Sequence, residues 1–263
     1  MANFVPPSSE ITARRRALLR WFGRYQRKLP WRRRPADPYH VLVSEAMLQQ
    51  TQVSTVVPYF ERFIDAFPTV EALASAEPQR VLRLWQGLGY YRRATNLQAA
   101  AVMVVDEFTG TIPAHVEDLL QLPGVGRYTA GAIASIAHGT KAPILDGNVA
   151  RVMARWFGIA EPIDRPDTRR RLWLLAERLL PPSNPGDFNQ AMMELGALVC
   201  TPARPTCTRC AVSRWCAAAH DGTAAMLPKR LPRRRPRPVT HHVVAIAKRG
   251  RYLFRPRRRC GRR

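Results

Sequence analysis

The sequence predicts an all-α protein, and two observations carry that prediction. Through most of the first 220 residues, apolar side chains recur at steps of three and four, the spacing of one helical face; examples are Ala94, Leu97, Ala101, Val104 and Phe108, then Leu172, Leu175 and Leu179. Between such segments lie stretches rich in Pro and Gly, FTGTIP and PPSNPGDF, that stop a helix and turn the chain. We therefore expect about ten helices, and we find no internal repeat.

Length and composition fit a soluble globular enzyme. The chain has 263 residues, of which 46% are apolar, enough to bury a sizeable core in one large domain or two small ones. No apolar run reaches the roughly 18 residues of a bilayer span, and the N-terminal MANFVPPSSEITARRR lacks the apolar core of a signal peptide. We expect a cytoplasmic monomer without membrane association.

The net charge of +23 is unevenly distributed. Of the 42 Lys and Arg residues, 15 follow Leu227, where there is no Asp or Glu, so residues 1–227 hold 27 basic against 19 acidic residues, a net charge of +8. A net charge of +8 on residues 1–227 favours a phosphate-bearing partner over a merely solvated basic face. The tail would add sequence-independent, salt-sensitive affinity for DNA.

The sequence changes character at Pro228. The segment PKRLPRRRPRP predicts a linker, which we place at 228–240, because it is too charged and too rich in Pro to pack. After it, HHVVAIAKRGRYLF predicts two short strands around a Lys-Arg-Gly turn. A hairpin of this size is marginal by itself.

Two carboxyl groups lie where catalysis could use them. Glu45 falls in the apolar segment VLVSEAMLQQTQV, where burial raises a carboxyl pKa; taken alone, a structural salt bridge is the better interpretation. Asp146 precedes a helical segment, which it would cap and whose N-terminus would hold it ionised. Together the two form a pair whose surroundings push their pKa values apart, as in sites with one acid and one charge-stabilising carboxylate.

The segment LPGVGRYTAGAIA, at 122–134, predicts a tight turn that leads into a helix. Its small residues leave backbone N–H groups bare at the helix N-terminus, which suits a phosphate. From Gly124 and Gly126 alone, an ordinary turn between two core helices would be the better interpretation.

Four of the five cysteines fall within seventeen residues. In a reducing compartment, clustered cysteines indicate a metal rather than disulfides. The spacing C-x6-C-x2-C-x5-C, formed by Cys200, Cys207, Cys210 and Cys216, supplies enough thiolates for a tetrahedral zinc or a 4Fe–4S cluster, and spacing alone does not separate the two. Cys260 lies outside the pattern and is expected to be a free thiol.

Taken in order, seven motifs and the four cysteines resemble the MutY family of adenine DNA glycosylases, in the helix-hairpin-helix superfamily that includes endonuclease III. The motifs run from about Leu18 to Cys216 and are PWR, SEAMLQQTQV, YFERF, LWQGLGYYRRA, LPGVGRYTAGA, ILDGNVAR and FNQAMMELGALVC. The resemblance implies two helical subdomains, one with the hairpin and one with a cluster loop at 200–216, and a base pocket between them. It implies one 4Fe–4S cluster per chain, and double-stranded DNA with adenine opposite 8-oxoguanine or guanine as the substrate, hence a place at the nucleoid.

The resemblance assigns catalytic roles to four matching residues. Glu45 would protonate adenine and later orient water, Asp146 would stabilise the oxocarbenium-like sugar with or without a covalent intermediate, and Tyr128 and Asn148 would support them. Bifunctional relatives carry a Lys at the position of Tyr128, whose amine forms a Schiff base, and a second Lys position of some MutY proteins is Ala150 here. The implied enzyme is monofunctional, with little or no lyase activity, and leaves an abasic site.

The resemblance also implies DNA-binding residues. Trp31, Arg32 and Glu194 would line the adenine pocket, and Gln49 and Tyr90 would fill the stack beside the extruded base. Without the motif context, the two aromatics would be half-buried core residues and Glu194 the partner of a nearby Arg. The remaining implied contacts to DNA are Gln50, Thr51, Leu122, Gly124, Val125 and Gly126.

The resemblance divides the chain into a catalytic domain at 1–227, the linker at 228–240 and the truncated start of a Nudix-like domain at 241–263. Family members read the oxidised guanine with that last domain, and only its opening hairpin is recognisable before RPRRRCGRR. We therefore expect adenine excision to be retained and the preference for 8-oxoguanine over guanine to be weakened.

Three other functions match part of this pattern. A thymine glycosylase acting on G·T mismatches would share the Tyr after the hairpin, although QQTQV and MELGALVC favour adenine. A catalytically weak form that only binds damaged DNA would not need both carboxyls. A nucleic-acid adaptor stabilised by zinc would use the same four cysteines but would be colourless.

Overall fold

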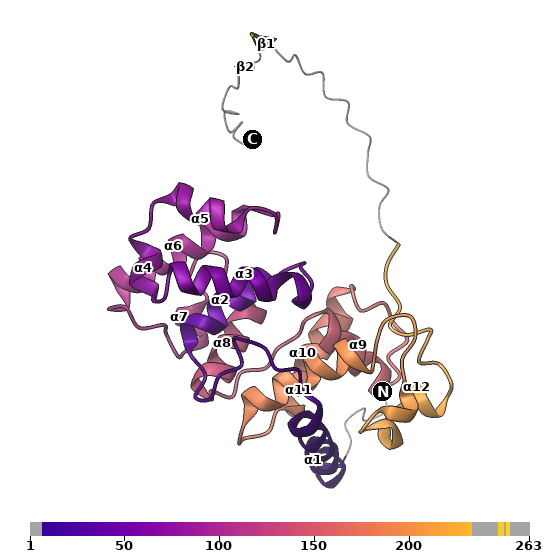
Figure 1. Ribbon diagram of the computed structural model, residues 1–263. Coiled ribbons are helices and arrows are strands. Elements are labelled where there is room, and N and C mark those ends of the chain that lie inside the picture. Colours follow the sequence, from indigo (N-terminus) through magenta and orange to yellow (C-terminus); the bar gives the residue numbers. More distant parts are fainter. Residues whose placement is uncertain (1–6, 233–246, 250, 253–263) are drawn as a thin grey trace. The chain divides into compact units, whose positions relative to one another are not determined.

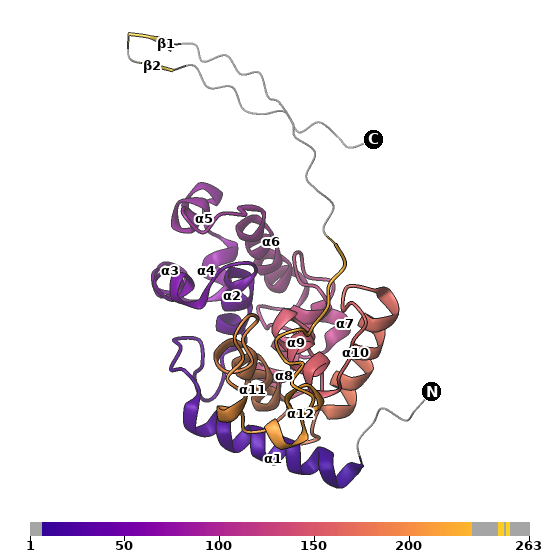
Figure 2. The ribbon, with the colours of Figure 1, turned by 90° about the vertical axis from the view of Figure 1, so that its right-hand side faces the viewer.

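The computed structural model describes residues 7–232, 247–249 and 251–252. Contacts divide the chain into two units, Met1–Leu231 and Pro232–Arg263, and the first holds all the described helices (Figures 1 and 2). These are α1 (Ser8–Tyr25), α2 (Pro38–Leu48), α3 (Val53–Ala66), α4 (Val70–Ala74), α5 (Pro78–Trp85), α6 (Arg92–Glu107), α7 (Val116–Leu119), α8 (Arg127–His138), α9 (Gly147–Trp156), α10 (Pro166–Leu179), α11 (Pro185–Leu198) and α12 (Ala217–His220), with short 3-10 turns at Cys207–Arg209 and Ser213–Trp215.

The all-α prediction is confirmed, with more helices than expected. The described residues form twelve α-helices, against the ten or so expected. Three of them, α4, α7 and α12, have only four or five residues, too few to show an apolar period.

Two separate hydrophobic cores define two subdomains in the first unit. One core, which includes Phe63 and Trp85, holds α2 to α8 together. The other, which includes Leu18 and Leu195, joins α1 with α9 to α12 and the loop of the four cysteines. The expectation of two helical subdomains is therefore confirmed.

Helix α8 connects the two subdomains. It contributes side chains to both cores, and it lies against α2 on one side and α11 on the other. Helix α11 in turn packs on α1 and α9. The starts of α8 and α9 and the facing sides of α2 and α11 are thereby fixed relative to one another.

The start of the predicted linker belongs to the first unit. The Ile163 N–H donates to the Lys229 carbonyl at 3.0 Å, and Arg230 lies 3.6 Å from the Asp164 carboxylate. Residues 233–240 of the predicted linker lie outside the described residues.

The second unit contains the predicted hairpin. Strands β1 (Ala247–Lys248) and β2 (Arg251–Tyr252) pair antiparallel, with Ala247 opposite Tyr252. Cys260, predicted to be a free thiol, lies outside the described residues.

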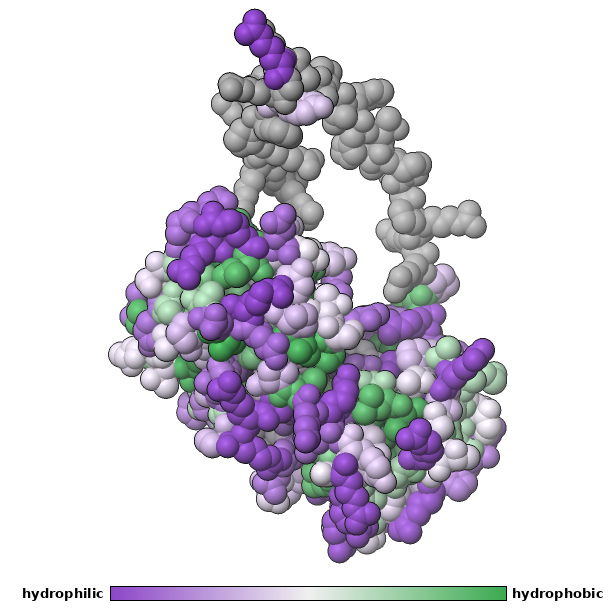
Figure 3. All heavy atoms as spheres, in the orientation of Figure 1, coloured by the Kyte–Doolittle hydropathy of each residue, from purple (hydrophilic) through white to green (hydrophobic). Residues whose placement is uncertain are grey.

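One face of the first unit is mostly polar. On the face drawn in Figure 3, hydrophilic residues predominate and hydrophobic ones form small patches among them. None of the helices within the described ranges combines the length and apolar character of a membrane span.

Candidate active site

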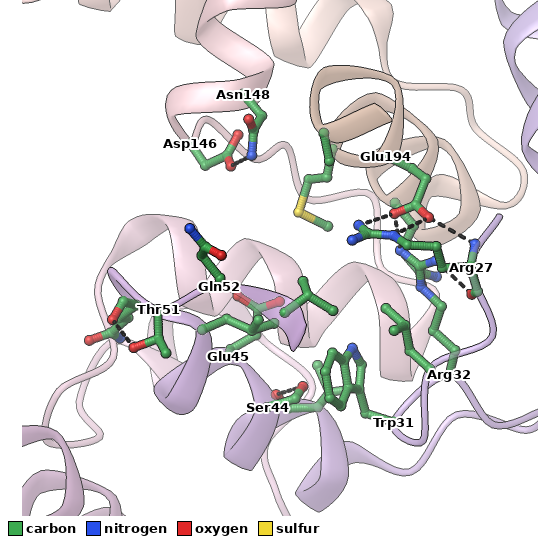
Figure 4. Close-up of a pocket in the computed structure, with 18 of the residues that line it drawn as sticks. Arg27, Trp31, Arg32, Ser44, Glu45, Thr51, Gln52, Asp146, Asn148 and Glu194 are labelled. Atoms are coloured by element: carbon green, nitrogen blue, oxygen red, sulfur yellow. Dashed lines mark hydrogen bonds and ion pairs between the residues drawn. The ribbon is translucent and has the colours of Figure 1, made fainter. Parts of the chain in front are cut away.

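A cavity of about 870 Å³ lies between the two subdomains and receives side chains from both (Figure 4). Ten of the predicted site residues line it: Trp31, Arg32, Glu45, Gln49, Gln50, Thr51, Tyr128, Asp146, Asn148 and Glu194. Five other residues predicted to contact DNA are not among those that line it: Tyr90, Leu122, Gly124, Val125 and Gly126.

Glu45 faces the cavity from α2. That helix begins at Pro38, where the Asp37 side chain accepts the first two free N–H groups, and it is apolar enough to be buried all round. Glu45 is only 6% exposed. Burial raises its pKa to about 7, the Asp146 charge adds to the rise, and the nearby Tyr128 hydroxyl and Arg32 oppose it.

The structural salt bridge that Glu45 alone suggested is wrong. Among the described residues, no ion pair includes Glu45. With a pKa of about 7, this buried carboxyl is protonated in about half of the molecules at pH 7.

Asp146 caps α9 and faces the same cavity. One carboxyl oxygen accepts the Val149 N–H at 2.7 Å, and the other accepts the Asn148 side-chain N–H at 3.0 Å. The predicted N-cap is confirmed, and the hydrogen bonds at the start of α9 lower the pKa of this carboxyl. Burial raises the pKa of Asp146 by more than these two hydrogen bonds and Arg151 lower it.

Arg151 links Asp146 to the cysteine loop through Asn148. Its guanidinium donates to the Asn148 side-chain oxygen at 2.7 Å and to the Cys200 carbonyl at 2.8 Å. Helix α11 lies close to α9 at this point, and the close approach requires Gly196. A Cβ at that position would lie 2.7 Å from the Asn148 Cβ. The orientation of Asn148 therefore depends on residues of the cysteine loop.

Glu194 holds a negative charge at the other end of the cavity. Its carboxylate accepts from the Arg27 backbone and guanidinium at 2.8–2.9 Å and from the Arg32 guanidinium at 2.9 Å. Burial alone would raise its pKa, but the two arginines outweigh burial and lower it to about 2. Glu194 is thus both the partner of nearby arginines and a wall of the cavity.

Replacing Glu194 with Gln should destabilise the protein by about 3 kcal/mol at pH 7, since a carboxyl whose pKa falls from 4.5 to about 2 on folding stabilises the folded state by that order. This stability is present above the unfolded pKa and is lost as pH falls through 4.5 to 2. Denaturant unfolding of both proteins between pH 2 and 7 measures it. A difference that does not shrink with acid would contradict the ion-pair explanation.

Trp31 and Tyr128 form apolar walls of the cavity. Trp31 is 7% exposed and packs edge-on against Phe60 with ring centroids 5.2 Å apart, so it belongs to the core and also lines the cavity. The Tyr128 hydroxyl donates to the Met193 sulfur at 3.1 Å. Burial keeps the pKa of Tyr128 well above its usual value, so the phenol stays neutral.

Tyr90 lies on the surface rather than in the core. Its side chain is 64% exposed, and its backbone has a φ of +46°. Gln50 has a φ of +59°. Left-handed backbone is unfavourable for residues other than glycine and collects at functional sites. The interpretation of Tyr90 as a half-buried core aromatic is wrong.

The predicted hairpin turn leaves the start of α8 open. Gly124 has a φ of +81°, and a Cβ there would lie 2.8 Å from the Asn96 Cβ, so the turn requires glycine. Gly126 is the N-cap of α8 and provides no side-chain hydrogen bond. The first N–H groups of the helix are therefore able to bind an anion.

The four clustered cysteines surround one small cavity on the loop after α11. Their thiols are free, and the Arg155 guanidinium donates to the Cys200 sulfur at 3.2 Å. The same guanidinium donates to the carbonyls of Thr201, Pro202 and Leu227 at 2.8 Å each. No group of three or more His, Cys, Asp or Glu within the described ranges is arranged to hold a single metal ion.

Sequence reasoning missed several residues of this site. Arg27 precedes the PWR motif, and no spacing relates it to Glu194, 167 positions away. Arg151 could have been found, because it lies three positions after Asn148 and residues at that separation share a helix face. Gln52, Gln190 and Met193 also line the cavity and carry no recognisable signal.

Comparisons with known proteins find relatives over most of this chain. A family model described as "HhH-GPD superfamily base excision DNA repair protein" matches residues 43–178. The chain is 51% identical over 218 residues to the adenine DNA glycosylase of Homo sapiens, covering 80% of this chain and 40% of that protein. It is 43% identical over 211 residues to the adenine DNA glycosylase of Mycolicibacterium smegmatis, covering 79% of this chain and 71% of that protein.

A solved structure shows the same fold. The structure of a thermostable thymine-DNA glycosylase matches with a TM-score of 0.73 at 29% identity, covering 81% of this chain and 98% of that one. The family model covers about half of this chain, and the M. smegmatis relative is matched over more than two thirds of its length. The chain therefore belongs to the HhH-GPD superfamily of base excision DNA repair proteins and, within it, to the adenine DNA glycosylase family.

Proposed function

We propose that the protein hydrolyses the N-glycosidic bond of adenine in double-stranded DNA, opposite 8-oxoguanine or guanine, and leaves an abasic site. The observation that carries the proposal is the cavity between the subdomains, where buried Glu45 and Asp146 face one space and their charges interact. The activity of the relatives, whose names are adenine DNA glycosylase, supports adenine as the base. A DNA substrate would place the protein at the nucleoid.

Glu45 acts as the acid in this proposal. With a pKa of about 7, it is protonated in a large fraction of molecules at neutral pH, as a general acid requires. It gives its proton to a ring nitrogen of adenine, the bond between nitrogen and sugar breaks, and its electron pair leaves with the base. The resulting carboxylate then takes a proton from the attacking water.

Asp146 stabilises the positive charge that develops on the sugar. Its two oxygens are held by Val149 and Asn148 and need not reorganise during the reaction. The described residues that line the cavity include no lysine, so no amine is there to form a Schiff base with the sugar. This supports hydrolysis without strand cleavage.

The DNA would be held by the open start of α8 and by two surface loops. The N–H groups at Gly126 would bind a backbone phosphate, as helix N-termini do. Gln49 and Tyr90 would fill the space that the extruded adenine leaves, replacing part of the lost stacking. The net positive charge would assist binding. The protein would act as a monomer.

The loop of four cysteines would hold a 4Fe–4S cluster. All four thiols surround one cavity, and Arg155 supplies an N–H to one sulfur, an arrangement that fits a group with several metal atoms. When bound, the cluster would cross-link the loop that supports Arg151. The residues that would hold it are Cys200, Cys207, Cys210 and Cys216.

The purified protein should be brown and contain about four iron and four sulfide per chain. Cys210→Ser should lose most of the visible absorption and the iron, because it removes one of four ligands. Cys260→Ser, which changes the cysteine outside the pattern, should keep both. A colourless parent protein with one zinc per chain would contradict the cluster and favour the zinc-stabilised adaptor.

Base release from defined duplexes tests the proposed function. We expect release of adenine opposite 8-oxoguanine and guanine, with abasic sites revealed by alkali and no adduct trapped by borohydride. The likeness to a thymine-DNA glycosylase structure makes thymine opposite guanine the comparison substrate. Thymine release without adenine release would overturn the proposal, and binding without any base release would favour a damage-binding protein.

A further inference from the structure

Arg93 lies between the two loops that carry Gln49 and Tyr90. It is in the first turn of α6 and is only 9% exposed. One loop joins α2 to α3 at residues 49–52, and the other joins α5 to α6 at residues 86–91. The two loops are some 40 positions apart in the sequence, so their relative position depends on tertiary contacts.

The Arg93 guanidinium holds one loop with each terminal nitrogen. Nη2 donates to two carbonyls of the second loop, those of Leu88 at 3.0 Å and Gly89 at 3.2 Å. Nη1 shares its N–H groups among acceptors at the end of α2 and in the first loop: the carbonyls of Met47 at 2.7 Å, Ala46 at 3.3 Å and Gln49 at 2.5 Å, and the Thr51 hydroxyl at 3.1 Å.

Among natural side chains, only a guanidinium can donate to both loops from two separate nitrogens. The last carbonyls of α2 have no intrahelical partner, and buried carbonyls without donors are unfavourable. A cation at a helix C-terminus is also stabilising. The planar fork of Arg directs separate N–H groups toward two loops, whereas Lys has one nitrogen and a compact charge.

Both loops hold a strained residue close to Arg93. Gln50 and Tyr90 have left-handed backbone, which is unfavourable by roughly 1–2 kcal/mol for a residue with a Cβ. Such conformations persist where the surroundings hold them. Arg93 lies 5.6 Å from the centre of the Tyr90 ring and 5.5 Å from that of the buried Trp85, so it supports the Tyr90 side chain as well as the loop backbone.

We propose that Arg93 is a positioning residue that joins these loops into one rigid wedge, so that Gln49 and Tyr90 enter the base stack together. This rests on the proposed function. Base extrusion requires unstacking that costs a few kcal/mol, and a wedge ordered before binding has no ordering entropy left to lose in the complex. The effect of Arg93 therefore falls on base extrusion, ahead of bond cleavage.

The test separates extrusion from chemistry in Arg93→Met. A duplex with 2-aminopurine next to the target adenine reports extrusion as a fluorescence rise, and single-turnover assays report base release with the active fraction titrated. We expect extrusion and release to slow together by about 10–100-fold, because a misplacement of about 1 Å can reduce a rate by up to that order. Arg93→Lys, which keeps the charge and is the milder change, should also slow extrusion.

Gln98→Met is the matched control. Gln98 lies on the same helix and donates to the Ala76 carbonyl at 2.7 Å, so it also ties α6 to a loop, but one without a candidate DNA residue. Its extrusion rate should equal that of the parent. Equal losses in both variants, or a normal extrusion rate in Arg93→Met, would overturn the coupling. A parent that extrudes and releases no adenine would instead overturn the proposed function.

Discussion

Glu45→Gln should lower the single-turnover rate of adenine release by about 10²–10⁴-fold, the usual contribution of a general acid. Glutamine has nearly the same shape but no proton to give, and adenine is a poor leaving group unless it is protonated. Rapid-quench assays under saturating enzyme measure the change. Glu107→Gln, an exposed carboxyl at the end of α6, is the control and should release adenine at the parent rate.

The same carboxyl predicts how the rate depends on pH. Because burial raises the pKa of Glu45 to about 7, the acid form predominates below that pH and disappears above it. The rate should therefore fall about tenfold per pH unit above 7. In Glu45→Gln the residual rate should not show this decline. A parent rate that stays constant from pH 6 to 9 would contradict Glu45 as the acid.

Glu45→Gln should also stabilise the protein at alkaline pH. The folded pKa of about 7 exceeds the unfolded value of 4.5, so the stability linked to this group is complete below 4.5 and is lost as pH rises through 7. The loss amounts to about 3 kcal/mol for this shift. Gln has no such loss, so its unfolding free energy should exceed that of the parent at pH 8–9. Higher stability with lower activity separates a catalytic role from a structural one.

The sequence predicts the parts of the fold that depend on local pattern. Long amphipathic helices such as α6 are visible in their apolar spacing, and the cap of α9 follows from an Asp before a helical segment. Helices of four or five residues cannot be recognised in the sequence, because they are stabilised by packing against the longer helices around them. The hairpin β1–β2 follows from two short runs around a turn.

The site was predictable only as far as motifs and helix faces extend. Glu45 and Asp146 could be paired by resemblance, but the pKa of Asp146 rises because of burial between α9 and its neighbours, which no local rule describes. The two arginines on Glu194 and the six acceptors of Arg93 come from segments far apart in the sequence. Such contacts exist only once both subdomains are packed.

Asp146→Asn should reduce adenine release by about 10²–10³-fold, the range found for removing one preorganised electrostatic contact in a transition state. Asn caps a helix about as well as Asp, so its oxygen can still accept the Val149 N–H at the start of α9. What the variant lacks is the negative charge beside the sugar and the second oxygen, which accepts the Asn148 N–H. Because burial raises the pKa of Asp146, losing the carboxylate should not lower stability at neutral pH.

Asp37→Asn is the matched control for that experiment, because Asp37 caps α2 through the N–H groups of Tyr39 and His40 and is not among the residues that line the cavity. Both variants exchange a capping carboxylate for an amide, so any effect of capping is common to them. Only Asp146→Asn removes a charge from the proposed reaction site. If Asp37→Asn lost activity to the same extent, the loss would reflect helix capping, and Asp146 would have no special part in stabilising the sugar cation.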